Sequence, residues 1–294
     1  MEADPASFVP LAGDVGGRRY FRVRSSRERS ALLVLYPEAS SAAQDNWRVV
    51  RGGLEAAGLR VPAIFADDPP TGGALIEDLG KEDLASEVAA AAPQERRRLV
   101  DEDEELLGRL RSIDPAVARR NPPFDARFFE NELAHTRLWA FERGGAAPLP
   151  PGPASVWTEL ARRMAREAAE PGPQGVLVPV HRDYHANNLM RAADGRLALI
   201  DFQDLRLGPA DYDPVSLRFE RAGALLPLPG PDRYREAVVL QRAWKVLGTF
   251  EKMLSKGRGV YAVHRDTARR VIRKCTSPGS AYGALLPFLD GPPA

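Results

Sequence analysis

The sequence predicts an α+β fold, with a small β-rich part over residues 1–80 and a larger, mainly helical part over residues 81–294. Short apolar or alternating runs typical of strands crowd into the first part. Beyond it, apolar residues recur at helical spacing, and one β-rich stretch near residues 176–201 interrupts the helices. A chain of 294 residues has room for two such parts, because domains span roughly 100–200 residues.

The β-rich part contains three predicted strands and one helix. Residues 20–24 alternate between polar and apolar side chains, and residues 31–36 and 74–77 form short apolar runs. The polar stretch SSRERS between the first two strands suits a hairpin. A helix is predicted over residues 42–57 and ends at Gly58, because glycine readily adopts the left-handed conformation that follows many helices.

The helical part shows apolar stripes separated by loops. The stripes, spaced by three, four or seven residues, are predicted to lie in the core and comprise Leu99, Leu106, Leu110 and Ile113, then Phe129, Leu133 and Ala140, then Val156, Leu160 and Met164. The stretches GGAAPLPPGPAS and LPLPGPD are predicted loops, because Pro removes a backbone donor and Gly loosens the chain. A further helix is predicted over residues 233–255.

Composition excludes several classes of protein. Hydrophobic residues make up 44% and charged residues 28%, as in ordinary globular proteins. The 41 Lys and Arg against 40 Asp and Glu leave a net charge of +1, which argues against nucleic acid as a partner. The single Cys275 excludes an intramolecular disulfide and a thiolate zinc cluster, and favours the cytoplasm. Because no apolar run reaches 18 residues and the start is acidic, we expect neither a membrane span nor a signal peptide.

Charge is unevenly distributed along the chain. Residues 205–294 hold 15 basic and 8 acidic residues, a net charge of +7, which leaves −6 for residues 1–204. Two interpretations stay open: the cations lie on solvated helix faces, or some of them meet an anionic ligand.

The β-rich stretch in the helical part brings polar residues to strand ends. An apolar run at residues 176–180 leads into HRDYHANNLM, and after a D-G turn a second run, LALI, ends at Asp201. Asp183, Asn188 and Asp201 together would form an oxygen-only site, and hard oxygen ligands favour Mg²⁺ or Ca²⁺ over zinc. An EF-hand is a poor fit, because its ligands come from one contiguous loop.

The same three residues follow the order of a kinase site. A kinase has a loop Asp that accepts the proton of the substrate hydroxyl, an Asn shortly after it that holds metal, and a strand-end Asp that holds metal. HRDYHANN supplies the first two as Asp183 and Asn188, and Asp201-Phe202-Gln203 stands where D-F-G is usual. The plainer alternative is that these residues only cap a buried hairpin.

HRDYHANNLM followed by LALIDFQDLRLGPADYDPVSL resembles the aminoglycoside-phosphotransferase superfamily of small-molecule kinases. Within it, the chain is most similar to the bacterial anomeric kinases of N-acetylmuramate and N-acetylglucosamine in cell-wall recycling. LAGDVGGRRYFRV, LIEDLG and QRAWKVLGTFEKM extend the resemblance over nearly the whole chain. It implies a two-lobed, protein-kinase-like fold, ATP as co-substrate, Mg²⁺ as cofactor and a small sugar as phosphoryl acceptor.

The resemblance also implies roles for single residues. Asp183 would be the catalytic base, and Asn188 and Asp201 would bind magnesium. The residues expected to bind ATP are those of the glycine-rich turn, the two arginines after it and the hinge segment: Gly13, Gly16, Gly17, Arg18, Arg19, Glu77, Asp78 and Leu79. Possible substrate-binding residues are Arg182, His185 and Asp204, although Asp204 could equally brace a loop, and Asp213 would brace the catalytic loop. His181 is expected to be a packing and hydrogen-bonding residue rather than a general base.

The chain departs from the kinase pattern in two places. Protein kinases carry a phosphate-binding Lys on the third strand, but ALLVLYPEAS contains none, and Arg18, Arg19 and Arg22 are the candidates to replace it. Residues 217–242 are shorter than their counterpart in the sugar kinases, and this bears on substrate choice.

Two alternative functions therefore stay open beside the sugar kinase. One is another small-molecule kinase of the same fold, such as an aminoglycoside kinase, although a +7 segment suits polycationic drugs poorly. The other is a nucleotide-binding pseudokinase that acts as a regulator. The choice between ATP and GTP, the hydroxyl that is phosphorylated and the oligomeric state are left open.

Overall fold

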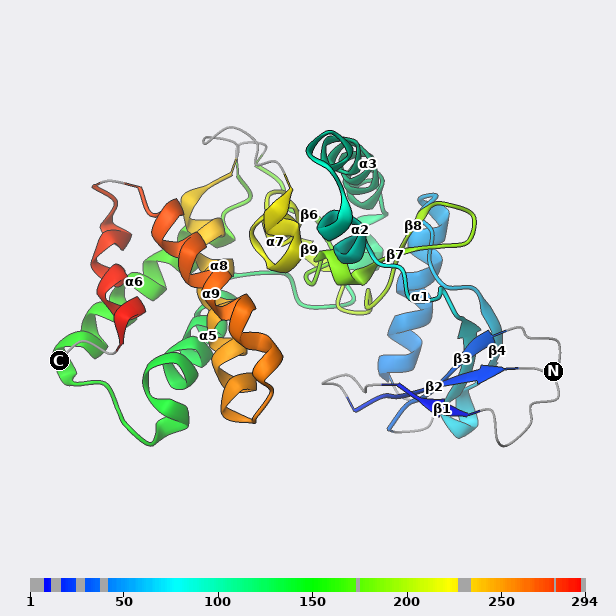
Figure 1. Ribbon diagram of the computed structural model, residues 1–294, viewed down its shortest axis with the longest axis horizontal. Helices are drawn as coiled ribbons and strands as arrows, with labels where there is room; N and C mark the ends of the chain where they lie inside the picture. Colours follow the sequence, from blue (N-terminus) through cyan, green and yellow to red (C-terminus); the bar gives the residue numbers. More distant parts are fainter. Residues whose placement is uncertain are drawn as a thin grey trace.

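The structure is a computed structural model, and it describes residues 8–11, 17–24, 30–37, 42–172, 175–226, 234–277 and 279–291. An antiparallel sheet near the N-terminus forms one end of the molecule, and helices α5, α6, α8 and α9 form the other (Figure 1). Helices α2, α3 and α7 lie between the two ends. This arrangement agrees with the predicted division into a small β-rich and a larger helical part.

The N-terminal sheet, as far as it is described, has five antiparallel strands in the order β1-β2-β3-β5-β4. Their bounds are Val9–Pro10 (β1), Arg19–Arg24 (β2), Ser30–Leu35 (β3), Ile64–Asp68 (β4) and Gly73–Glu77 (β5). The strands predicted at 20–24, 31–36 and 74–77 are thus confirmed to within a residue. Sequence analysis missed β1, which has two residues, and β4, whose sequence IFADD does not alternate and is largely exposed.

Helix α1, Ala42–Ala56, packs on this sheet and closes the core of the β-rich part. Trp47, Val50 and Leu54 recur at helical spacing and are buried with Val34 and Ile76 of the sheet. Gly58 follows the helix with φ +73°, as its predicted role as a helix stop requires.

Three helices and two small antiparallel strand pairs lie between the sheet and the helical end (Figure 1). The helices are α2 (Leu84–Ala90), α3 (Pro93–Arg111) and α4 (Pro115–Ala118), and single turns lie at Pro69–Thr71, Ala186–Asn188 and Arg221–Leu225. The strand pairs are β6 (Val178–Val180) with β9 (Arg206–Gly208), and the hairpin of β7 (Leu189–Arg191) with β8 (Leu197–Leu199).

The hairpin adds one strand that the sequence did not predict. The D-G turn joins β7 to β8, and the end of HRDYHANNLM itself forms β7. A three-residue strand inside a polar stretch leaves no usable alternation in the sequence. The polar loop therefore runs from β6, whose partner β9 comes later in the chain, into the β7–β8 hairpin.

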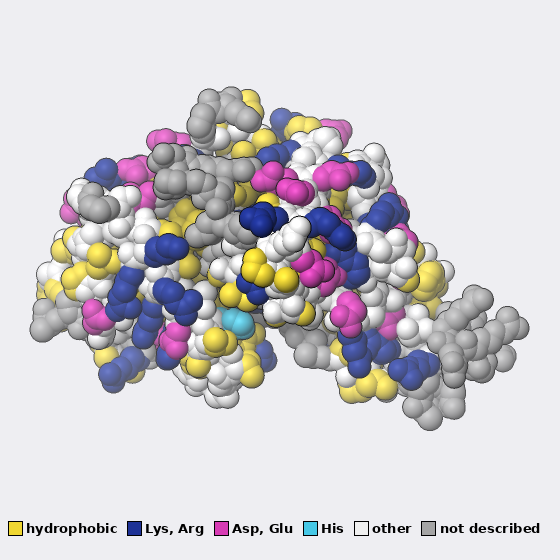
Figure 2. Space-filling view, turned by 45° about the horizontal axis from the view of Figure 1, so that its top comes forward, with side chains coloured by type: hydrophobic (Ala, Val, Ile, Leu, Met, Phe, Trp, Pro, Cys, Tyr) yellow, Lys and Arg dark blue, Asp and Glu magenta, His cyan; other side chains and the backbone are white. Residues whose placement is uncertain are grey.

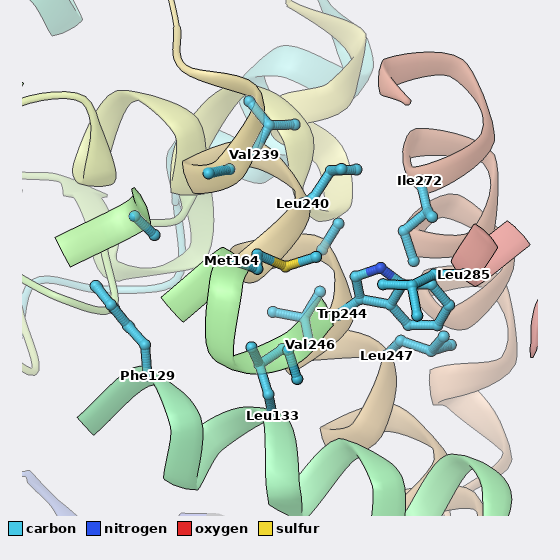
Figure 3. Packing of buried hydrophobic residues seen from close by; sticks show 14 of the residues in the cluster. Phe129, Leu133, Met164, Val239, Leu240, Trp244, Val246, Leu247, Ile272 and Leu285 are labelled. Carbon is cyan, nitrogen blue, oxygen red and sulfur yellow. The ribbon is translucent and has the colours of Figure 1, made fainter. Parts of the chain in front are cut away.

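The helical end is built around α8, Glu236–Ser255, which begins three residues later than predicted. The other elements are α5 (Ala126–Thr136), the π-helical turn η3 (Arg137–Phe141), α6 (Pro151–Ala169), α7 (Tyr212–Phe219), α9 (Ala262–Cys275) and short turns at Arg143–Gly145, Gly259–Tyr261 and Ala281–Asp290. Figure 3 shows Trp244, Leu240 and Leu247 of α8 among side chains of the neighbouring helices.

The predicted apolar stripes lie in the cores with one exception. Leu99, Leu110, Phe129 and Met164 are buried, but Val156 is 39% exposed. The buried face of α6 runs through Trp157 instead, because Trp157 begins the i, i+4, i+7 stripe that faces α5 and α8.

No helix within the described ranges is both long and apolar enough to cross a membrane. Lys and Arg side chains gather over the helical end on the face drawn in Figure 2. This placement agrees with the excess of basic residues in the last third of the sequence.

Candidate active site

The loop over residues 181–188 follows β6 and is anchored by Asp213 of α7. The Asp213 carboxylate accepts hydrogen bonds from the backbone N–H groups of His181, at 2.6 Å, and Arg182, at 3.1 Å. Arg182 has φ +79°, a left-handed conformation that is costly for a residue with a Cβ and persists only where the surroundings enforce it. The predicted bracing role of Asp213 is confirmed by these two contacts.

Asp183 lies in this loop beside two cations of α8. Its Oδ1 is 3.5 Å from Lys245 Nζ and 3.6 Å from Arg242 Nη2. Burial by itself raises the pKa of Asp183, but the charges of Lys245 and then Arg242 outweigh it, so the pKa lies well below its ordinary value. Asp183 is therefore an anion at neutral pH, able to accept a hydrogen bond from a hydroxyl group.

Asn188, the last residue of this loop, and Asp201, which follows β8, line one cleft. The Asn188 side-chain NH₂ donates to the backbone O of Asp183 at 2.8 Å, so the orientation of the amide is fixed. The backbone N–H of Ile200 donates to Asn188 O at 3.1 Å, and His181 Nε2 lies 3.0 Å from Ile200 O. Asp201 then turns away from β8 with φ +61°, a conformation that Asp tolerates better than most residues.

The oxygens of Asn188 and Asp201 fit a magnesium ion better than a transition metal. Within the described residues, no cluster of three His, Cys, Asp or Glu side chains could hold a metal by itself. Magnesium needs only one or two protein oxygens, because it keeps several waters and takes its remaining ligands from substrate phosphates. The donor set is therefore suited to Mg²⁺ that arrives with a nucleotide.

The cleft between the sheet and the β7–β8 hairpin has a volume of about 390 Å³, within the range of small-molecule sites. Its walls are mostly apolar, with several charged and polar residues among them: the lining comprises Arg18, Tyr20, Leu32, Trp47, Pro62, Ile76, Glu77, Asp78, Leu79, Gly80, Asn188, Met190, Ile200, Asp201, Phe202 and Gln203. Trp47 and Phe202 stack with ring centroids 5.7 Å apart. The apolar residues could contact a flat base, and the charged residues could contact phosphate groups.

Arg18 is the one of the three candidate cations that lines the cleft. It donates to Asp201 Oδ1 and to Gln203 Oε1, both at 3.0 Å, and Gln203 Nε2 donates to the same Asp201 oxygen at 2.9 Å. Arg22 is instead paired with Asp78 at 2.6 Å, and Arg19 is exposed on β2. Gln203, which replaces the usual Gly, thus joins Arg18 to Asp201.

The glycine-rich turn can be followed only in part. Gly17 has φ +80°, which favours glycine over other residues, and it is exposed. Gly13 and Gly16 lie outside the described residues.

The hinge segment lines the cleft as predicted, but its acidic side chains are engaged elsewhere. Glu77 pairs with Arg60 and accepts from Ala63 N at 3.0 Å, while Asp78 is held by Arg22. Burial raises the pKa of each carboxyl, but the hydrogen bonds from the arginines and from backbone N–H groups together outweigh it, so both pKa values are lowered. Contacts of this segment to a bound base would therefore fall to its backbone and to Leu79.

The three possible substrate-binding residues lie in different surroundings. Arg182 Nη1 donates to Asp204 Oδ2 at 2.6 Å, and the Asp204 side chain remains 38% exposed. His185 is only 8% exposed; burial, followed by the charge of Arg221, lowers its pKa to about 4. Arg182 and Asp204 can thus face a ligand more readily than His185.

The sequence did not predict that Arg242 and Lys245 of α8 reach Asp183, or that Glu220 pairs with Arg242. Arg242 is buried and donates to Glu220 at 2.7 Å, to Tyr212 Oη at 3.0 Å and to Arg182 O at 3.2 Å. Burial alone raises the pKa of Glu220, but the charge of Arg242, together with smaller contributions from His185 and Arg221, outweighs it and lowers the pKa to about 2. The segment QRAWK carries Arg242 and Lys245 and belongs to the family resemblance, yet nothing in its helical spacing indicates contact with a loop 60 residues earlier.

Comparison with solved structures places this fold among the protein-kinase-like small-molecule kinases. A thermostable mutant of aminoglycoside phosphotransferase APH(4)-Ia is similar with a TM-score of 0.62 at 15% identity, over 92% of this chain and 95% of the other. A choline/ethanolamine kinase family protein from Mesorhizobium loti is similar with a TM-score of 0.56 at 15% identity, over 96% and 92% of the chains. These likenesses confirm the predicted fold class.

Residues 7–253 match the phosphotransferase enzyme family, and the chain belongs to that family. An N-acetylmuramate/N-acetylglucosamine kinase from Pseudomonas aeruginosa is 30% identical over 244 residues, which is 83% of this chain and 67% of that protein. A kinase of the same description from Caulobacter vibrioides is 28% identical over 74% of this chain. The chain spans 67% of the length of the Pseudomonas aeruginosa relative and 60% of the length of the Caulobacter vibrioides relative.

Proposed function

We propose that this phosphotransferase moves the γ-phosphoryl group of ATP to a sugar hydroxyl, the anomeric hydroxyl of N-acetylmuramate or N-acetylglucosamine. One observation carries the proposal: Asp183 is hydrogen-bonded to Asn188, and Asn188 lines a nucleotide-sized cleft together with Asp201. The relatives from Pseudomonas aeruginosa and Caulobacter vibrioides, described as kinases of these two amino sugars, support the choice of acceptor.

Asp183 orients the acceptor hydroxyl and takes its proton. Its depressed pKa makes it a weak base, so positioning contributes more than early proton removal. This suits phosphoryl transfer, in which the transition state is loose and the hydroxyl proton leaves late. The brace from Asp213 to the backbone of His181 and Arg182 holds the loop in place during the reaction.

Asn188 and Asp201 are proposed to hold Mg²⁺, which supplies positive charge for the nucleotide phosphates. Arg18 is proposed to replace the strand lysine of protein kinases, because it lines the cleft and lies 3.0 Å from Asp201. The adenine would lie between the apolar walls, next to the hinge residues Glu77, Asp78 and Leu79. Gly17 would lie near the phosphates, while Arg182 and Asp204 would face the sugar.

The proposal can be tested by following ADP release from ATP and Mg²⁺. The acceptors are N-acetylmuramate, N-acetylglucosamine, glucosamine, glucose, galactose and kanamycin, with EDTA and Asp183→Asn as controls. We expect turnover on an N-acetylated sugar, loss of turnover with EDTA, and a fall of about 10³-fold or more in kcat for Asp183→Asn. Phosphorus NMR of the product identifies the hydroxyl that is phosphorylated.

Other outcomes would contradict the proposal in different ways. Turnover on kanamycin alone would make the protein an aminoglycoside kinase of the same fold. Binding of ATP without transfer to any acceptor would favour a nucleotide-binding regulator. Unchanged turnover in Asp183→Asn would show that another group orients the hydroxyl.

A further inference from the structure

Lys245 ends beside the proposed catalytic aspartate without being locked into the fold. Its Nζ lies 3.5 Å from Asp183 Oδ1, and among the described residues this ion pair is its one charged contact. The Lys245 side chain is 17% exposed, so it is not fully enclosed by the fold. An ammonium group has three N–H donors, and Asp183 can satisfy only part of that capacity.

Arg242, one turn earlier on α8, is arranged in the opposite way. Its side chain is 2% exposed and is held by Glu220, Tyr212 Oη and the backbone O of Arg182. These contacts fix α8 against the loop that carries Asp183. Arg242 is thus a structural cation, and Lys245 is the cation that remains able to meet a ligand.

The position of Lys245 matches the place where negative charge must be bound in phosphoryl transfer. A hydroxyl group that donates to Asp183 has the transferred phosphorus on its other side, within reach of a flexible lysine near the same carboxylate. Lysine is a common phosphate ligand because it acts as a mobile point charge. Arg18, in contrast, lies with Asp201 at the nucleotide side of the site.

We propose that Lys245 binds the phosphoryl group while it is transferred from ATP to the acceptor. This inference rests on the proposed kinase reaction and adds a catalytic residue to it. The acceptor oxygen forms a bond to the γ-phosphorus while the bond from that phosphorus to the β,γ-bridging oxygen breaks. The bond's electron pair stays on ADP, and the hydroxyl proton passes to Asp183. Lys245 neutralises the oxygens of the phosphoryl group in the transition state and exchanges no proton.

The inference can be tested with Lys245→Met, Lys245→Arg and a control on the same helix, Lys252→Met. Lys252 contacts His135 and Trp139 rather than the catalytic loop. We expect Lys245→Met to lower kcat by about 10²- to 10³-fold with KM for ATP changed by about twofold or less, as for loss of a transition-state contact. Lys245→Arg should recover part of the rate, and Lys252→Met should match the wild type.

A binding measurement separates this inference from the identity of the sugar. Aluminium fluoride with ADP and Mg²⁺ mimics the transferring phosphoryl group, and calorimetry reports the affinity without an acceptor. We expect aluminium fluoride to tighten ADP binding about tenfold or more in the wild type and in Lys252→Met, and not in Lys245→Met. Equal tightening in Lys245→Met and wild type, or an unchanged kcat, would overturn the role of Lys245. Absence of turnover on every sugar contradicts the proposed acceptor, and the aluminium fluoride measurement then still tests Lys245.

Discussion

Arg18 connects two parts of the molecule that are far apart in the sequence. It precedes β2 of the N-terminal sheet, yet it contacts Asp201, 183 residues later, and Gln203. The contact brings a cation to the cleft of a chain whose third strand lacks the phosphate-binding lysine of protein kinases. Arg19, its neighbour, is exposed and lies outside the lining of the cleft.

Comparing Arg18→Ala with Arg19→Ala therefore tests which arginine binds the nucleotide phosphates. We expect Arg18→Ala to weaken ATP binding about 10- to 100-fold, because a charge-assisted hydrogen bond contributes about 1.5–3 kcal/mol. Arg19→Ala should bind ATP as the wild type does. Calorimetry with a non-hydrolysable ATP analogue measures both, and equal affinities for the two variants would exclude Arg18 as the phosphate ligand.

Helix α8 links the core of the helical end to the site. Its apolar residues, including Trp244 and Leu247, pack in the cluster of Figure 3, while Arg242 and Lys245 reach the loop with Asp183. The helix can approach α5 closely because Gly248 has no side chain. A Cβ at Gly248 would lie 2.5 Å from Thr136 Cα, so the backbone of one helix would have to move.

Gly248→Ala should consequently destabilise the fold, despite the better helix propensity of alanine. We expect a loss of about 1–3 kcal/mol in the free energy of unfolding, the usual cost of overpacking. Gly108→Ala is the matched control, because Gly108 lies within α3 with no atom near its missing Cβ. That variant should gain about 0.5–1 kcal/mol. Urea unfolding measures both, and a stable Gly248→Ala would show that α5 and α8 are not in close contact.

At the scale of the whole molecule, buried histidine links stability to pH. Burial and then Arg221 lower the pKa of His185 to about 4 from the ordinary value of 6.5. Between pH 6.5 and 4 the unfolded chain binds a proton that the folded site excludes. The free energy of unfolding should therefore fall as the pH falls through this window, by about 3 kcal/mol in total from this group.

His185→Gln tests this coupling, because glutamine does not titrate. We expect the unfolding free energy of the variant to depend less on pH than that of the wild type between pH 6.5 and 4. His264→Gln is the comparison: burial lowers the pKa of His264 too, but this side chain is only half-buried, so a smaller effect is expected. Parallel profiles for wild type and His185→Gln would contradict the prediction.

The sequence by itself determined the fold class and the central residues of the candidate site. Asp183, Asn188 and Asp201 lie within one short stretch, where the D-G turn pairs the strand that follows Asn188 with the strand that precedes Asp201. Such local geometry depends on alternation and turn chemistry, which a sequence displays directly. The predicted strands of the sheet, together with α1, followed from the same local patterns.

Only the tertiary structure decided which cations reach the site. Arg18 meets Asp201 because the sheet packs against the β7–β8 hairpin, and Lys245 meets Asp183 because α8 packs against the loop after β6. The sequence narrowed the first cation only to Arg18, Arg19 and Arg22, and Lys245 is one of 41 basic residues, most of which suit a solvated surface equally well. Long-range packing selects among chemically identical side chains, and no local pattern records that selection.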